Sequence, residues 1–371
     1  MEKTELLCIG NPIVDLFVNI NEKIAARYGI LDFAQHIQYE EAETLLYECT
    51  ANFKRAKKCS GGGAANVAKI AAMLGIKTVF TGCTGNDEPA AFFEKEMTQA
   101  GVYSILKKSG GKTGLCFACN IENQNISAYE LNSLGTQSVF NELRYAAYPG
   151  AALELTEADI SEELISSAEV IVLDGYVLDR RPLVQHVLLK ASRRGIPVAL
   201  DVASVVQAKS KAEEILTYSR SFPLIIFMNA DEMIAFYNTV RKIQYEETLT
   251  SDKDKESFIL QEAGPMLKMM TDCEIFPIIA VKLGSRGAVI FAGGNMYHEE
   301  TFTVVPRNIV GAGDSFCAAF ISAWIRGESL SECAVLGNKV ARKILEVPGT
   351  KIKSGKLKYF ANMLRRVKEK A

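Results

Sequence analysis

The chain has 371 residues, of which 48% are hydrophobic, 23% charged and 9% aromatic, and this composition excludes collagen-like, coiled-coil and wholly disordered proteins. Its 42 Lys and Arg residues against 44 Asp and Glu residues give a net charge of −2, so we expect no nucleic-acid partner. Nine scattered cysteines and the lack of a long apolar run or a signal-peptide pattern predict reduced thiols, a cytoplasmic location and no membrane partner.

Short apolar runs alternate with amphipathic stretches along the chain. Buried strands are predicted at residues 6–10, 78–82, 170–174, 198–201, 224–229 and 278–283. Helices are predicted between them, at residues 64–74, 89–100, 182–194 and 256–270. This order is typical of a parallel sheet with helices on both faces, so the predicted fold class is α/β, with a doubly wound, mostly parallel sheet.

Three of the predicted strands end in a polar residue, namely Asp174, Asp201 and Asn229. In open α/β sheets, ligands bind beyond the carboxyl ends of the strands. These three residues are therefore candidate site positions.

Two stretches break the alternation, because the strand patterns at residues 17–20 and 114–129 have no helix directly after them. Residues 114–121 and 126–131 are interpreted as a hairpin around Asn-Gln-Asn, and the extra strands as a small β lid over the sheet. The expected division assigns residues 1–12, 58–111 and 132–371 to the large domain, and residues 13–57 and 112–131 to the lid.

Two charged stretches are expected to be solvated. Residues 240–256 (VRKIQYEETLTSDKDKE) are predicted to form an excursion on the surface. The basic tail from Lys351 onward is predicted to form an amphipathic helix with one face in water.

The first motif that could carry chemistry is SGGGAAN, at residues 60–66, directly before a predicted helix. Three consecutive glycines allow positive φ angles or a close approach of the backbone to a ligand, and Asn66 offers an amide to a hydroxyl. The alternative is a tight strand-to-helix turn without a ligand. The motif is not the dinucleotide fingerprint, which needs Gly where Asn66 stands.

The second motif is VGAGDSF, at residues 310–316, before an apolar helix. Small residues at a helix N-terminus expose backbone N–H groups that bind phosphate. Asp314 in the first turn is either a charge partner of the helix or a general base for a hydroxyl held beside a phosphate. The motif is not a Walker loop, because the Lys-Ser/Thr ending is missing.

Three weaker motifs each have a structural and a functional interpretation. Asn229 and Glu232 are spaced as a helix N-cap and its box partner, or they place a carboxylate near a hydrated Mg²⁺. Gly284 and Gly287 bound a turn between two strands. Asp15 follows the first strand, where it either occupies a surface turn or grips two hydroxyls of a sugar.

Taken together and in this order, the motifs resemble those of the ribokinase family, also called the PfkB carbohydrate kinases, over nearly the whole chain. The family's first signature matches Gly62 through Asn66, with Gly75 and Gly85 at the expected spacing, its second matches residues 311–316, and its Asn-x-x-Glu motif matches Asn229 and Glu232. Within the family, the N-terminal sequence GNPIVDLFVNI and the stretch Tyr28-Gly29-Ile30 are most similar to adenosine kinases.

The resemblance implies a ribokinase-like fold with a small β lid, ATP and Mg²⁺ as cofactors, and transfer of the γ-phosphate to a primary hydroxyl of an adenosine-like nucleoside or a sugar. By position, it implies Asp314 as the catalytic base, with Gly311, Ala312 and Gly313 as the anion hole. The implied acceptor ligands are Asp15, Asn11, Gln35, Gly62, Gly63 and Asn66. The implied nucleotide ligands are Asn229, Lys282, Gly284, Gly287 and Asn338, with Glu232 bound to Mg²⁺ through water.

The resemblance leaves two alternatives open, which are a different sugar or nucleoside as acceptor, and a non-catalytic homologue that binds a ligand. Asn308 and Ile309 stand where the family usually has Asp-Thr near a monovalent-cation site, so dependence on such a cation is left open. Gln124 and Asn125 stand where adenosine kinases carry Arg, and Asp201 where many members have Asn. The expected partner is a small molecule, and both a monomer and a homodimer are compatible with the sequence.

Overall fold

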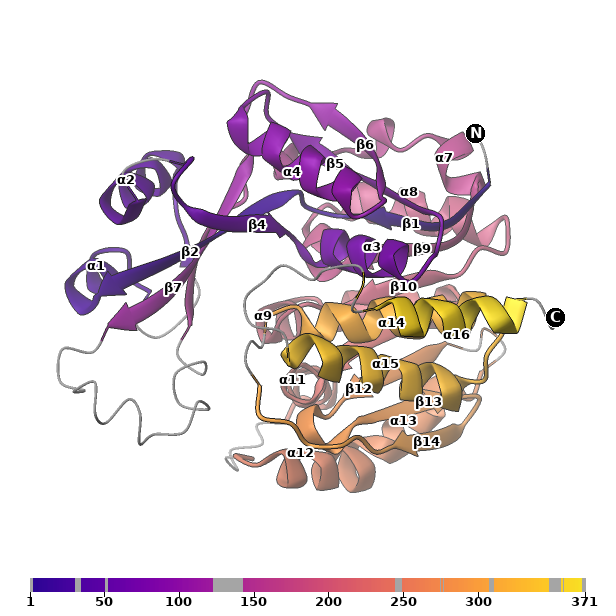
Figure 1. Ribbon diagram of the computed structural model, residues 1–371. Coiled ribbons are helices and arrows are strands. Elements are labelled where there is room, and N and C mark those ends of the chain that lie inside the picture. The colour runs from indigo at the N-terminus through magenta and orange to yellow at the C-terminus, as the bar shows by residue number, and fades with distance from the viewer. Residues whose placement is uncertain are drawn as a thin grey trace.

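The structure is a computed structural model, in which two β-sheets of different size are joined by several passages of the chain (Figure 1). It describes residues 3–30, 35–50, 53–122, 143–243, 249–273, 275, 277–306, 310–346, 355 and 357–368.

The large sheet has nine strands among the described residues, in the order β14-β13-β12-β11-β10-β9-β1-β5-β6. The strands from β6 to β12 pair in parallel, and β13 and β14 add an antiparallel edge. Their bounds are β1 Thr4–Ile9, β5 Thr78–Thr84, β6 Tyr103–Lys108, β9 Ala168–Asp174, β10 Val198–Asp201, β11 Leu224–Asn229, β12 Ile278–Lys282, β13 Ala288–Ala292 and β14 Asn295–Glu299. The strands predicted from apolar runs are all present.

Helices cover both faces of this sheet. Successive side chains of a strand point to opposite faces, so each central strand packs against helices on both sides. Leu6 and Cys8 of β1 pack with α3 Gly63–Met73, α4 Glu88–Gln99, α14 Ala312–Ile325, α15 Leu330–Leu345 and α16 Lys358–Lys368. Leu7 and Ile9 pack with α7 Glu162–Ser166, α8 Arg181–Ser192, α10 Ala212–Ser221, α11 Ala230–Arg241 and α13 Gly264–Thr271. The predicted doubly wound α/β fold is confirmed.

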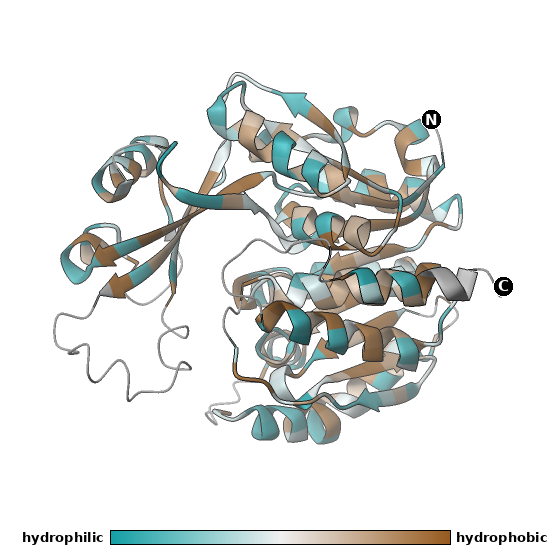
Figure 2. Cartoon of the chain, in the orientation of Figure 1, coloured by the Kyte–Doolittle hydropathy of each residue, from teal (hydrophilic) through white to brown (hydrophobic). Residues whose placement is uncertain are grey.

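The small sheet has the order β3-β8-β7-β2-β4 among the described residues. Its strands are β2 Ile13–Asn21, β3 Gln35–His36, β4 Lys57–Gly61, β7 Gly114–Glu122 and β8 Arg144–Tyr148. Buried and less buried residues alternate along β2, a largely hydrophobic strand (Figure 2), and its buried side chains pack with α1 Glu22–Arg27 and α2 Tyr39–Thr50. Asp15 lies on the opposite face of β2, which these helices leave uncovered.

The strand that pairs antiparallel with β7 comes later in the sequence than the second strand of the expected hairpin. Residues 126–131 and the boundary at residue 132 lie outside the described residues. The antiparallel partner that β7 has is β8 Arg144–Tyr148, a segment that the expected division assigned to the large domain. Sequence periodicity gives strand character but not strand pairing, so the distant partner was missed.

Between described elements, the chain passes from one sheet to the other four times, from β1 to β2, from β4 to α3, from β6 to β7, and from β8 to the 3₁₀ turn Gly150–Glu154. Arg180 ties the first of these passages to the fourth. Its Nη2 donates to Asn11 Oδ1 at 2.6 Å, and its Nη1 donates to the carbonyl of Ala152.

The predicted polar strand ends lie at one edge of the large sheet. The strand register places Asp174 beside Asp201, and Asn229 beside Lys282. These four residues are the last residues of β9, β10, β11 and β12.

The charged stretch at residues 240–256 was expected to be an excursion on the surface, but part of it belongs to a helix. Residues 244–248 lie outside the described residues, but α12 Asp252–Phe258 is a helix, with Ser251 as its N-cap and Phe258 buried in the core. A serine before an acidic first turn is a helix-start signal, and the density of charge concealed it. The tail forms the predicted helix over α16, and none of the described helices is both long and apolar enough to span a membrane.

Candidate active site

The site is centred on the N-terminus of α14. Gly311 precedes the helix with a φ of 80°, and Asp314 lies in the first turn, as predicted. The first backbone N–H groups of a helix have no partner within it, so the turn that contains Ala312 and Gly313 offers donors and a positive dipole to an anion. Asn66 Nδ2 on α3 donates to Asp314 Oδ2 at 2.8 Å. The two glycine-rich motifs, which are far apart in the sequence, therefore meet at one carboxylate.

The surroundings of Asp314 weaken its ionised form. Burial, and then the nearby charge of Asp201, raise its pKa to about 6, while the hydrogen bond from Asn66 and the charge of Lys282 act in the opposite direction. A carboxyl with this pKa is ionised at neutral pH and accepts a proton more readily than an ordinary aspartate.

We expect the rate of the reaction to fall in acid well above the pKa of an ordinary aspartate. A base with a pKa of about 6 is protonated below that pH, so kcat at saturating ATP and acceptor should fall about tenfold per pH unit there. A pH–rate profile between pH 4.5 and 9 checks this, with the residual activity of Asp314→Asn as the control that lacks this limb. Full activity at pH 5 would contradict the assignment of the base.

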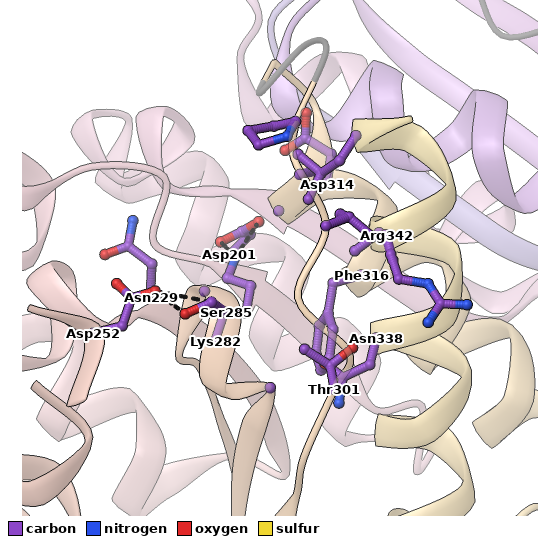
Figure 3. A pocket seen from close by; sticks show the side chains of 18 of the residues that line it. Asp201, Asn229, Asp252, Lys282, Ser285, Thr301, Asp314, Phe316, Asn338 and Arg342 are labelled. Atoms are coloured by element: carbon purple, nitrogen blue, oxygen red, sulfur yellow. Dashed lines mark hydrogen bonds and ion pairs between the residues drawn. The ribbon is translucent and has the colours of Figure 1, made fainter. Parts of the chain in front are cut away.

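A cavity of about 730 Å³ extends from Asp314 along the edge of the large sheet. Ten of the predicted site residues line it, namely Gly63, Asn229, Glu232, Lys282, Gly284, Gly287, Ala312, Gly313, Asp314 and Asn338. Figure 3 shows Asp314 at one end, with Asn338 and Thr301 at the other. The residues predicted to bind the nucleotide and two of the three residues predicted for the anion hole therefore share one cavity.

Asn229 and Glu232 satisfy the structural interpretation of their motif. Asn229 Oδ1 accepts from the Glu232 backbone N–H at 2.9 Å, and Glu232 Oε2 accepts from the Asn229 backbone N–H at 2.8 Å, which is a capping box at the start of α11. Both residues also line the cavity. Burial raises the pKa of Glu232 to about 7, against the charge of Lys282.

The turn at residues 284–287 joins β12 to β13 in a hairpin, as predicted, and also borders the cavity. Asp252 at the start of α12 holds it, accepting from the backbone N–H and the hydroxyl of Ser285 at 2.9 and 2.6 Å (Figure 3). A Cβ at Gly287 would overlap the carbonyl of Glu299.

The opposite wall of the cavity is a face of α15. Asn338, Ala341, Arg342 and Leu345 line it, at the spacing that puts helix residues on one face. Asn338 Nδ2 donates to the carbonyl of Glu299 at 2.9 Å, and the Arg342 guanidinium lies 5.6 Å from the ring centre of the exposed Phe302. Of this wall, sequence reasoning named only Asn338, although the helical spacing would have indicated the others.

Of the predicted acceptor residues, Gly63 lines the cavity and Asn66 is bonded to Asp314 at its end. A Cβ at Gly61 would overlap the Asp15 carboxylate, and a Cβ at Gly62 would overlap the carbonyl of Asn11. Burial raises the pKa of Asp15 to about 7, with Lys69 lowering it and Asp314 raising it further. Asp15 and Asp314 are therefore close enough to interact. Gln35 lies in β3, but its side chain lies outside the described residues.

Asp174 and Arg180 were not predicted as a pair. Asp174 is buried at the end of β9, and its Oδ1 accepts from the Tyr176 backbone N–H at 3.0 Å. Burial raises its pKa, and the charge of Arg180 opposes this rise. Because Arg has only donors, its bond to Asn11 fixes Oδ1 of that amide as the acceptor.

Gly62→Ala is expected to damage the acceptor side specifically. Gly62 has a φ of 94°, and a Cβ there would overlap the Asn11 carbonyl, so the change adds a clash to a backbone cost of about 1–3 kcal/mol. Gly75→Ala is a matched control, because Gly75 has a φ of 90° with no atom within 4 Å of its Cβ position. Thermal unfolding and acceptor KM check this. Both variants should lose stability, and only Gly62→Ala should raise the acceptor KM.

Comparison with known proteins agrees with this arrangement. The family model described as pfkB family carbohydrate kinase matches residues 28–356. An adenosine kinase of Schizophyllum commune is 26% identical over an alignment of 371 positions, which covers 95% of this chain and 98% of that protein. A 5-dehydro-2-deoxygluconokinase of Listeria innocua is 24% identical over 76% of this chain and 80% of that protein. The crystal structure of adenosine kinase from Sinorhizobium meliloti has a TM-score of 0.75 at 23% identity, and the match covers 98% of this chain and 99% of that one. The predicted resemblance is confirmed, and the chain belongs to the pfkB family of carbohydrate kinases.

Proposed function

We propose that this kinase transfers the γ-phosphate of ATP to a primary hydroxyl of a nucleoside, with adenosine as the first acceptor to test. The observation that carries the proposal is the hydrogen bond from Asn66 to Asp314, which joins the acceptor turn to the N-terminus of α14. The base, Asp314, and the anion site at the start of α14 are therefore next to the turn that would hold the acceptor hydroxyl. The relative named as an adenosine kinase, which covers 95% of this chain, supports the choice of acceptor.

The residues of the cavity fit a hydrated Mg²⁺. No group of three or more His, Cys, Asp or Glu among the described residues could hold a metal ion. Glu232 lines the cavity with both carboxylate oxygens hydrogen-bonded to Asn229, so it suits contact with a metal through water. Mg²⁺ usually keeps several waters and takes its other ligands from substrate phosphates. When bound there, it would neutralise charge on the phosphates of ATP.

The chain's own groups account for the rest of the reaction. Asp314 takes the proton from the acceptor hydroxyl as the hydroxyl oxygen attacks the γ-phosphorus, whose bond to the bridging oxygen breaks so that ADP leaves. The N–H groups at the start of α14 and the ammonium of Lys282 hold the negative charge of the transferring group. Asp15, on the uncovered face of β2, grips two hydroxyls of the acceptor. We infer that the small sheet acts as a lid, which excludes water as a competing acceptor.

The test is ATP consumption with Mg²⁺ and a panel of adenosine, inosine, guanosine, cytidine, ribose and fructose. Turnover with a nucleoside that is lost in Asp314→Asn supports the proposal. Turnover with sugars alone would show that the acceptor is a sugar. The name of the 24% identical relative, 5-dehydro-2-deoxygluconokinase, indicates such an acceptor for that protein. ATP binding without turnover on any acceptor would favour a non-catalytic homologue.

A further inference from the structure

We propose that Asp201 is a positioning residue, which holds the Lys282 ammonium beside the N-terminus of α14 so that this charge is in place when the donor phosphates arrive. The inference rests on the proposed function, in which those phosphates occupy the cavity. Its position at a strand end made Asp201 a candidate site residue, but the family signatures assign it no chemical role.

Asp201, Lys282 and Cys317 form a cluster at the cavity. Lys282 Nζ lies 3.1 and 3.3 Å from the two carboxylate oxygens of Asp201 and 3.7 Å from Cys317 Sγ. The Cys317 thiol donates to Asp201 Oδ2 at 3.1 Å. The Asp201 and Lys282 side chains are only 10% and 14% exposed, and both line the cavity (Figure 3). The three residues come from β10, β12 and α14, so the cluster joins the sheet to the helix.

The ammonium lies against the predicted anion hole. A Cβ at Gly313 would lie 3.4 Å from Lys282 Nζ, and Gly313 is in the first turn of α14. Lysine is a compact point charge on a flexible stem, so its position depends on what holds it. Asp201 and Cys317 hold this one at the place where a phosphate would meet both the ammonium and the helix N-terminus.

Asp201 also keeps Lys282 charged. Burial acts to lower the pKa of Lys282, but Asp201, Cys317 and Glu232 together raise it above its ordinary value. The charged groups that face this amine within the cavity are Asp201, Glu232 and Asp314. Without the Asp201 charge, burial would lower the pKa of the amine toward the working pH.

The backbone after Asp201 is held in an uncommon conformation. Ala203 has a φ of 70°, and the Ser204 N–H donates to the Val202 carbonyl at 2.9 Å, which is a strained γ-turn. Ala203 lines the cavity. Such strain persists only where the surrounding structure fixes the backbone. The backbone directly after Asp201, at the end of β10, is therefore held in place by its surroundings.

The test compares ATP binding and turnover in wild type and Asp201→Asn, which keeps the shape of the side chain and removes its charge. We expect the Kd and KM of ATP to rise about tenfold, which corresponds to about 1.4 kcal/mol, with the acceptor KM unchanged. The alkaline fall of kcat/KM for ATP should begin at a lower pH in the variant than in wild type, because its lysine loses the proton more readily without the Asp201 charge. Glu162→Gln, which breaks the exposed pair with Lys190, should change neither quantity.

Two further measurements keep the proposal falsifiable. If Asp201→Asn unfolds, the double variant Asp201→Asn/Lys282→Met is compared with Lys282→Met, and equal ATP affinity supports the proposal because Asp201 then acts only through Lys282. An unchanged ATP affinity and pH profile in Asp201→Asn would overturn it, as would a change in the Mg²⁺ requirement alone. Calorimetric ATP binding needs no acceptor, so it distinguishes failure of this inference from failure of the proposed function.

Discussion

Asp314→Asn should lower kcat by about 10²–10⁴-fold, the usual contribution of a general base, while ATP binding stays within a few-fold of wild type. The amide has nearly the shape of the carboxylate and can still bond Asn66, whose Nδ2 donates to Asp314 Oδ2 in the structure, but it takes no proton. Steady-state kinetics at saturating ATP and acceptor measure the loss, and calorimetry measures the binding.

The same variant should be more stable than wild type at high pH. The folded-state pKa of Asp314 is raised to about 6 from an ordinary value of 3.8, so its charge costs stability as the pH rises from about 4 through about 6. The Asn variant escapes this cost, so its Tm should exceed that of wild type at pH 8, and the gap should shrink at pH 4.5. A kcat near wild type would contradict the role of the base, and a lower Tm at pH 8 would contradict the electrostatic account.

Asp15→Ala should raise the acceptor KM by about 10–100-fold and leave the ATP KM within about twofold. The variant lacks the carboxylate that would accept hydrogen bonds from two hydroxyls, and a hydrogen bond to a charged group is worth about 1.5–3 kcal/mol. Water replaces part of this lost energy. The effect is confined to the acceptor because Asp15 lies on the small sheet and does not line the cavity. Initial rates with each substrate varied in turn check this.

Asp15→Asn is the matched control for size. It keeps one acceptor oxygen and should fall between wild type and Asp15→Ala in acceptor KM. Because the pKa of Asp15 is about 7, the wild-type acceptor KM should also rise below pH 7, and that rise should be absent in both variants. An equal rise in the KM of ATP and acceptor would count against the grip on hydroxyls.

The predictable part of this structure is the part that local sequence encodes. Apolar runs predicted six of the nine strands that the described part of the large sheet contains, all except β6, β13 and β14. Glycine-rich turns before helices predicted the starts of α3 and α14. The box of Asn229 and Glu232 was also readable, because its spacing of three residues is fixed by the geometry of a helix start and the structure forms it.

Contacts that depend on the order of strands in the sheets could not be predicted from local sequence. Lys282 and Asp201 are 81 residues apart and meet because β10 and β12 both flank β11. Arg180 reaches Asn11 across 169 residues, from the end of a 3₁₀ turn to the first passage between the sheets. The pairing of β8 with β7 belongs to the same class. Each depends on a register that no single stretch of sequence contains.

The small sheet is assembled from two separate excursions of the chain, one carrying β2, β3 and β4 and the other β7 and β8, which meet through the parallel pairings of β2 with β7 and of β3 with β8. An isolated pair of strands is marginally stable in water, and β5 and β6 of the large sheet lie between the two excursions in the sequence. Long loops must close before such non-local pairs form. We therefore expect the large sheet to fold first and the small sheet last, and the backbone amides of β2 and β7 to exchange with solvent together, at a lower opening free energy than those of β1 and β9. The small sheet, which carries the proposed acceptor residue Asp15, is then the last part of the chain to fold and the first to unfold locally.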